Sequence, residues 1–180
     1  MVSVQESAPA NQSNWKKMDN KTIKKYLSEF DEKIKNDEIV SVLFSGVGGQ
    51  GILLATAIMA HACLYEDYDV KVTEVHGMAQ RGGSVVGSVR FGRKVFSPVI
   101  SKADIIVSLE KLESLRYIDK LENNGIIIIN DYEVLPISVF GGKFFYPHEI
   151  SAKIKNFTGN FLIIKASIGI IAKSAKSING

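Results

Sequence analysis

The chain has 180 residues, 46% of them hydrophobic, and a formal net charge of +3 at pH 7. This length and composition suit one domain with a buried core. The 22 basic and 19 acidic residues are spread along the chain and form no basic patch, which argues against a nucleic-acid-binding protein. The single cysteine, Cys63, excludes an internal disulfide. It also excludes an iron–sulfur cluster held by this chain alone, since such a cluster needs about four thiolates.

The first 38 residues divide into two segments. Residues 1–18 are rich in Ser, Asn, Gln and Pro, and we expect a disordered tail because they offer little apolar surface to offset the cost of ordering. They lack a secretion signal, and no stretch of the chain reaches about 18 uncharged apolar residues, so we expect a cytoplasmic protein without membrane contact. Residues 19–38 predict an amphipathic helix that either packs on its own domain or docks onto a partner. Its apolar side chains recur every three or four residues: Ile23, Tyr26, Leu27, Phe30 and Ile34.

From residue 39 onward, strand patterns alternate with helix patterns. Strands are predicted at 39–45, 70–75, 84–91, 105–109 and 125–130, with 94–96 as a hairpin partner of 84–91 and 143–146 as an edge strand. Helices are predicted at 52–65, at 112–121 with Asn123-Asn124-Gly125 ending it, at 149–155 and, on grounds of length, at 161–175. The alternation indicates an α/β domain over residues 39–180. In this three-layer structure, helices cover both faces of a mostly parallel sheet.

A Rossmann-like glycine turn, Gly46-Val47-Gly48-Gly49-Gln50-Gly51, joins the first strand of this domain to an apolar helix. Gly46 is expected to permit the sharp turn, Gly48 and Gly49 to leave room for a ligand, and Gly51 to let the helix pack closely on the sheet. Free backbone N–H groups at the start of the helix, aided by the helix dipole, favour an anion such as phosphate. The alternative is a tight turn that packs without a ligand.

A second motif, Gln80-Arg81-Gly82-Gly83, follows the next predicted strand. Arg81 is suited to bind phosphate or carboxylate through two hydrogen bonds, or else it pairs with a nearby acid. Glu74 lies 23 residues after Gly51 (74 minus 51). That spacing is compatible with the ribose-binding acid of a dinucleotide fold, so a stand-alone NAD(P)-binding module is one interpretation.

Together, the two motifs resemble the gamma-type subunits or domains of 2-oxoacid:ferredoxin oxidoreductases, and most closely their indolepyruvate branch. Further agreements are Arg90, Ser97-Pro98, Ala103-Asp104 and Glu110. The resemblance covers about residues 39–175. It implies that residues 39–180 are a gamma-type domain, shorter at its C-terminus than is usual in the family.

The resemblance also implies a function. Such enzymes decarboxylate a 2-oxoacid oxidatively on thiamine diphosphate, pass electrons through 4Fe–4S clusters to ferredoxin, and transfer the acyl group to coenzyme A. Thiamine diphosphate and the clusters belong to a large alpha-type partner subunit, so this chain is expected to be inactive alone and to hold no catalytic residue and no metal. Its expected part is a phosphate- and coenzyme A-facing wall of the shared site. The candidate residues are Gly46, Gly48, Gly49, Gln50, Gly51, Glu74, Gln80, Arg81, Gly82 and Gly83. A non-catalytic scaffold subunit is a further alternative.

Overall fold

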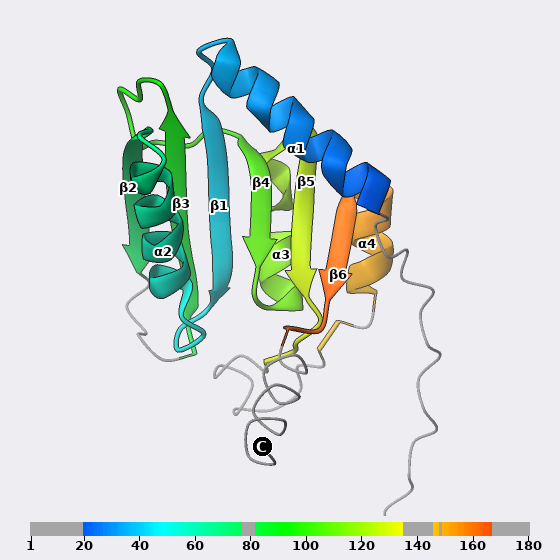
Figure 1. Cartoon of the computed structure of the whole chain (residues 1–180). Coiled ribbons are helices and arrows are strands. Elements are labelled where there is room, and N and C mark those ends of the chain that lie inside the picture. The colour runs from blue at the N-terminus through cyan, green and yellow to red at the C-terminus, as the bar shows by residue number, and fades with distance from the viewer. Residues whose placement is uncertain (1–19, 77–81, 135–145, 148, 167–180) are drawn as a thin grey trace, which may run out of the picture.

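A computed structural model of the chain describes residues 20–76, 82–134, 146–147 and 149–166 (Figure 1). The predicted tail at 1–18 therefore lies outside the described residues. None of the described helices is long and apolar enough to cross a membrane. The elements in chain order are α1 (Asn20–Lys35), β1 (Val40–Val47), α2 (Ile52–Tyr65), β2 (Asp69–His76), β3 (Ser84–Gly92), β4 (Ala103–Ser108), α3 (Lys111–Tyr117), the 3-10 helix η1 (Ile118–Lys120), β5 (Leu121–Asn130), α4 (Ile150–Phe157) and β6 (Phe161–Ile164).

The six described strands form one mixed sheet in the order β2-β3-β1-β4-β5-β6. The predicted parallel arrangement is present in β1, β4, β5 and β6, which pair in parallel. At the other edge, β3 runs antiparallel to both β1 and β2. The chain between β2 and β3, residues 77–83, is too short for a crossover, which needs about a dozen residues or more. The mixed sheet follows from that short connection.

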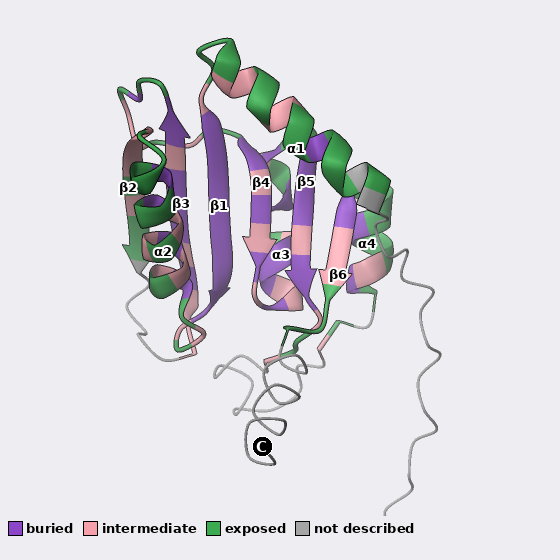
Figure 2. Ribbon diagram, in the orientation of Figure 1, coloured by how far each residue is buried: buried purple, intermediate pink, exposed green. Residues whose placement is uncertain are grey.

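Helices cover both faces of the sheet, which confirms the predicted α/β class (Figure 1). Side chains of β1 alternate between two apolar cores. Val42 and Phe44 lie in the core that includes residues of α2, whereas Leu43 lies in the core that includes residues of α4. Strand β1 is consequently buried along its whole length (Figure 2), as expected for an interior strand covered on both faces.

The helix α2 approaches the sheet most closely at Gly87 of β3. A Cβ atom at Gly87 would collide with the hydroxyl of Thr56, and Thr56 Oγ1 donates to the carbonyl oxygen of Ile52 at 2.9 Å. Gly87 therefore permits the close helix–sheet packing that was expected of Gly51. A Cβ atom at Gly51 would meet nothing within 4 Å.

The predicted hairpin partner at 94–96 is wrong, because these residues are not in a strand. Val95 is buried instead. Its backbone N–H donates to the Asp69 carboxylate at 2.8 Å. A side chain at the start of β2 thus holds this segment in place of a strand ladder.

The predicted helix end at Asn123-Asn124-Gly125 is also wrong. Helix α3 ends at Tyr117, and these three residues belong to β5. Leu121 is buried and pairs with Ala103 at the start of β4. Gly125 is required by close approach, since its Cβ atom would lie 2.9 Å from the carbonyl oxygen of Asp104.

The apolar run predicted as a helix at 161–175 begins as strand β6, which pairs in parallel with β5. Length misled the prediction here, because the run begins with an edge strand. Residues 167–175 lie outside the described residues. So do 143–145 of the predicted edge strand, and Tyr146 is not in a strand. The predicted helix at 149–155 is confirmed as α4.

The predicted N-terminal helix is confirmed as α1. Phe30 and Ile34 pack against the core that includes α2, so this helix lies on the domain. Lys33 Nζ contacts Asp104 Oδ1 at 2.5 Å, which ties α1 to β4. Ile23 and Leu27 remain exposed.

Candidate functional site

The glycine turn lies where β1 ends and α2 begins, at the carboxyl end of the parallel strands. Gly49 and Gly51 have φ angles of 102° and 81°, in the left-handed region that favours glycine. Gly51 is the residue that precedes the first turn of α2. Both glycines are exposed, and a Cβ atom at either would face open space. Their role is to set the direction of the backbone without covering it.

Gly46 has a different role from the one expected, because it lies within β1 and not in the turn. A Cβ atom there would come within 2.6 Å of Gln50 Oε1 and 2.7 Å of Ile52 Cδ1. The missing side chain makes room for the Gln50 amide to fold back under the turn.

That amide is used within the protein. Gln50 Oε1 accepts the N–H of Val47 at 2.7 Å, and its Nε2 donates to the carbonyl oxygen of Leu109 at 3.3 Å. Asn130 Nδ2 donates to the same carbonyl at 3.3 Å. Gln50 therefore joins the carboxyl ends of β1 and β4. Both polar atoms of its amide bond to the backbone, so Gln50 acts as a positioning residue and not as a ligand contact.

The gap bridged by Gln50 is a topological switch point. Strands β1 and β4 are parallel neighbours, and the helices that follow them, α2 and α3, lie on opposite faces of the sheet (Figure 1). Ligands of open α/β sheets bind in the crevice that this divergence opens at the carboxyl ends of the strands. The glycine turn lies at this switch point.

The second motif meets the first at this place. The N–H of Gly48 donates to the carbonyl oxygen of Gly83 at 2.8 Å, and the N–H of Gly82 donates to the carbonyl oxygen of Gly48 at 3.4 Å. The two glycine motifs, about 30 residues apart in the sequence, are thus adjacent in space. Gln80 and Arg81 lie outside the described residues, although Arg81 directly precedes Gly82 in the chain.

This arrangement is suited to bind an anion. The first N–H groups of a helix have no acceptor within the helix, and α2 has no acidic residue in its first turn. Together with the helix dipole, these groups favour negative charge next to Gly49 and Gly51. Lys111 contributes little positive charge to the site, because it pairs with Asp131 and Glu133.

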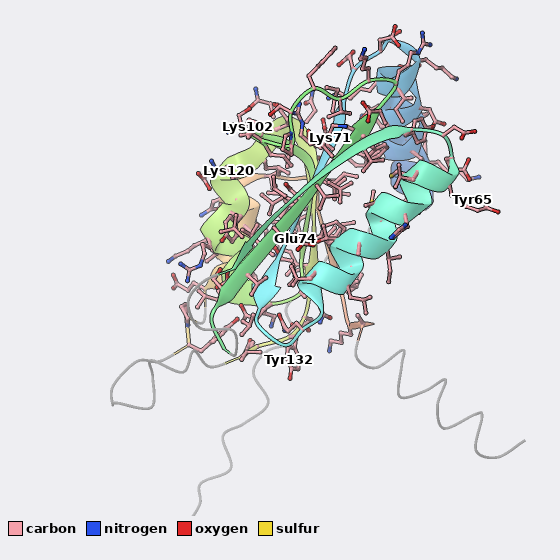
Figure 3. All side chains as sticks on the ribbon, turned by 90° about the vertical axis from the view of Figure 1, so that its left-hand side faces the viewer. Tyr65, Lys71, Glu74, Lys102, Lys120 and Tyr132 are labelled. Carbon is pink, nitrogen blue, oxygen red and sulfur yellow. The ribbon has the colours of Figure 1, made fainter. Side chains whose placement is uncertain are left out.

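Glu74 is not part of this site. It lies on β2 opposite Gly87, which in turn lies opposite Phe44, three residues before the end of β1. Because β3 separates β2 from β1, Glu74 is two strand spacings, about 10 Å, to the side of β1. Figure 3 shows Glu74 partway along β2. A dinucleotide-type site needs its acid at the end of the strand beside β1.

Two buried carboxylates, Glu110 and Glu113, accept hydrogen bonds from segments next to the glycine motifs. Neither was assigned to the site from the sequence. Glu110 is 1% exposed. It accepts hydrogen bonds from the N–H of Glu113 (2.9 Å), the N–H of Val134 (3.3 Å) and the hydroxyl of Tyr146 (2.5 Å). Burial and the neighbouring Glu110 carboxylate raise the pKa of the Tyr146 hydroxyl, so that hydroxyl stays a donor.

Glu113, the second of these carboxylates, anchors the other motif. It accepts from the hydroxyl of Ser84, the residue after Gly83, at 2.5 Å, and from Arg116 Nε at 3.1 Å. One sequence feature could have identified both acids: they lie at the start of a predicted helix, directly after an apolar strand. Acidic residues stabilise that end of a helix.

The described residues include no group of three or more His, Cys, Asp or Glu side chains that could hold a metal ion. Cys63 lies on the buried side of α2, in the core between this helix and the sheet, and burial raises the pKa of its thiol. This environment suits a core residue and not a reactive thiol.

The fold and the joined glycine motifs define an α/β protein with a glycine turn at the switch point of its sheet. A family model described as pyruvate ferredoxin/flavodoxin oxidoreductase matches residues 41–176, and the chain belongs to this family. The earlier resemblance is thereby confirmed. Helix α1 lies outside the matched region.

The chain is similar to several indolepyruvate oxidoreductase subunits named IorB. It is 42% identical to that of Pyrococcus horikoshii over 131 residues, which are 70% of this chain and 65% of the relative. It is 38% identical to that of Archaeoglobus fulgidus over 143 residues, 77% of this chain and 70% of the relative. The match to the first of these relatives thus spans slightly less than two thirds of its length.

Two solved structures share the fold. The pyruvate oxidoreductase subunit PORC of Thermotoga maritima aligns with a TM-score of 0.51 at 18% identity and covers 71% of this chain and 62% of its own. The 2-oxoglutarate:ferredoxin oxidoreductase of Magnetococcus marinus aligns with a TM-score of 0.52 at 16% identity, covering 79% of this chain and 22% of its own. At these identities the likeness concerns the fold alone.

Proposed function

We propose that this chain is the thiamine-free and cluster-free subunit of an indolepyruvate:ferredoxin oxidoreductase. Its relatives are subunits of indolepyruvate oxidoreductases, and the Magnetococcus marinus neighbour was solved with 2-oxoglutarate, coenzyme A and succinyl-CoA bound. In this proposal a large partner subunit holds thiamine diphosphate and 4Fe–4S clusters, and ferredoxin accepts the electrons. The complex is cytoplasmic. Residues 39–180 form the gamma-type domain, and residues 19–38 form an extension.

The observation that supports a coenzyme A-facing wall is the joining of the two glycine motifs through Gly48, Gly82 and Gly83. Coenzyme A carries phosphates, and a helix start flanked by side-chain-free backbone is a site where phosphate binds. Arg81, one residue from Gly82, supplies a guanidinium for the same anion. Gln50 and Glu113 hold the two motifs in place from within. This chain therefore binds and orients, and the redox chemistry belongs to the partner's cofactors.

The test is Gly49→Val in the complex with its partner subunit. A β-branched side chain at φ 102° is strained and covers the backbone that the phosphate would approach. The expected result is a KM for coenzyme A raised about 10-fold or more, equivalent to about 1.4 kcal/mol, with assembly intact. Gly159→Val is the control for adding an exposed β-branched side chain, because Gly159 is also exposed with open space around its Cβ position.

An unchanged KM for coenzyme A in Gly49→Val would contradict the wall, and turnover by the isolated chain would contradict the subunit role. Loss of assembly in Gly49→Val, with no coenzyme A effect in the complex that remains, would favour the scaffold interpretation. The NAD(P)-binding alternative loses support from the structure, because β3 lies between β1 and the strand that carries Glu74.

A further inference from the structure

The outer side of α2 is an exposed apolar stripe. We define the α2 stripe as Leu54, Ile58, His61 and Tyr65, which a helical repeat places on one side. Leu54 is 65% exposed, Ile58 60% and Tyr65 90%, and His61 is exposed as well. Figure 3 shows Tyr65 extending away from the domain at the end of the helix.

This stripe differs from the exposed sides of the other described helices. Helix α2 contains no Asp, Glu, Lys or Arg over its 14 residues, whereas α1, α3 and α4 all carry charged residues. A helix that is apolar on all sides belongs in an interior. The sheet covers the inner side of α2, where Thr56, Ala60 and Cys63 are buried. No other element of the described chain covers the outer side.

We infer that the α2 stripe is the docking surface for the large partner subunit, an inference that rests on the proposed function. The stripe begins at Leu54, three residues after Gly51, so it continues directly from the glycine turn. A partner that shares an active site at that turn necessarily lies at this end of α2. The same partner then covers the apolar residues that follow along the helix.

The size of the stripe favours this occupant over a second copy of the chain. A helix of 14 residues is about 21 Å long and about 10 Å wide, so one side of it offers roughly 200 Å². A stable interface buries about 800 Å² on each partner. The stripe is therefore one part of a larger interface, and the proposed function already places the partner's share of the active site at the end of the helix where the stripe begins.

A segment of this chain is a poorer candidate. Helix α2 packs on β1, β2 and β3. The last described strand, β6, lies at the opposite edge of the sheet from β2. The partner segment that fits the stripe is apolar and uncharged, because a charge placed against Leu54 or Ile58 would lose its water without gaining an opposite charge. Tyr65, as an exposed aromatic residue, is the expected anchor.

The test measures the affinity of the full chain for the large thiamine-binding subunit of the proposed complex, using wild type, Ile58→Glu and Tyr65→Ser. Phe157→Glu is the control, since Phe157 is 53% exposed and lies on α4, away from α2 (Figure 1). We expect both stripe variants to lose about 30-fold or more in affinity, as interface hot spots do, while Phe157→Glu binds as wild type. Circular dichroism and thermal melting check that each variant is folded. If Ile58→Glu fails to fold, Tyr65→Ser decides, because its side chain is almost fully exposed.

The outcomes separate the two proposals. If wild type does not bind the large subunit, the proposed function fails and this inference fails with it. If wild type binds and both stripe variants bind equally well, the docking surface is wrong while the proposed function stands. If sedimentation shows a wild-type dimer that the stripe variants lose without any change in partner affinity, the stripe belongs to a second copy and the inference is overturned.

Discussion

Replacing Glu110 by Gln tests whether the buried carboxylate supports the site as described. Its two oxygens accept three hydrogen bonds, from Glu113, Val134 and Tyr146. A glutamine keeps one acceptor oxygen and places an NH₂ group where the other oxygen was. At least one buried donor then faces another donor, which costs about 1–3 kcal/mol. Loss of the negative charge at the start of α3 adds about 0.3–1 kcal/mol.

The expected net loss is about 2 kcal/mol of unfolding free energy, because the neutral amide is less costly to bury than a carboxylate. This should appear in urea unfolding at pH 7 and as a fall in Tm of about 4–8 °C. Glu149→Gln is the matched control. Glu149 also precedes a helix, but it is exposed and its side chain makes no capping hydrogen bond, so the change should stay within about 0.5 kcal/mol.

Tyr146→Phe measures the contribution of the Tyr146 hydroxyl separately from that of the Glu110 carboxylate. It removes one donor to Glu110 and the acceptor of the Leu112 N–H, and should cost about 1–3 kcal/mol. In the double variant the two losses should fall short of their sum, because both changes affect the same hydrogen bond. If Glu110→Gln unfolds at the same urea concentration as wild type, the Glu110 carboxylate does not hold the start of α3, Val134 and Tyr146 together, and its structural role as described is wrong.

Two further changes test the packing of α2. Gly87→Ala should lower the unfolding free energy by about 1–3 kcal/mol, because the new methyl group meets the Thr56 hydroxyl. In urea unfolding, the double variant Gly87→Ala and Thr56→Ala should recover most of that loss. Equal stability of Gly87→Ala and wild type would refute the close approach. Burial raises the pKa of the Cys63 thiol, so at pH 8 a thiol reagent should label native protein far more slowly than protein in urea, and equal rates in the two conditions would show that Cys63 is accessible.

The sequence predicted the unit β1–glycine turn–α2 because its determinants are local. A short β-branched run, closely spaced glycines and a long uncharged helix are all visible within residues 39–65. The contribution of Gln50 was not visible in this way. Its amide bonds to Leu109, 59 positions away in the sequence, and no local pattern reports that β4 will lie beside β1. The same reason hid the roles of Glu110 and Glu113, whose partners come from Ser84, Val134 and Tyr146.

The errors in secondary structure also have physical causes. Leu121 continued the helical spacing of Leu112, Leu115 and Ile118, but its burial against β4 decided for a strand. Phe161–Ile164 is apolar in either conformation, and the open edge of β5 selected the extended one. In both cases a tertiary contact overrode a local preference.

The glycine turn and the α2 stripe belong to one continuous segment, residues 46–65, yet they should respond to different changes. Gly49→Val alters the backbone surface near the anion site and leaves the stripe untouched, so the KM for coenzyme A should rise while the affinity for the partner stays. Ile58→Glu lies two helical turns further on, so partner affinity should fall, while complex assembled at saturating subunit concentration should keep its KM. If instead each variant altered both quantities, the start of α2 and its outer side would act as a single contact. The separation of ligand binding from docking would then have to be abandoned.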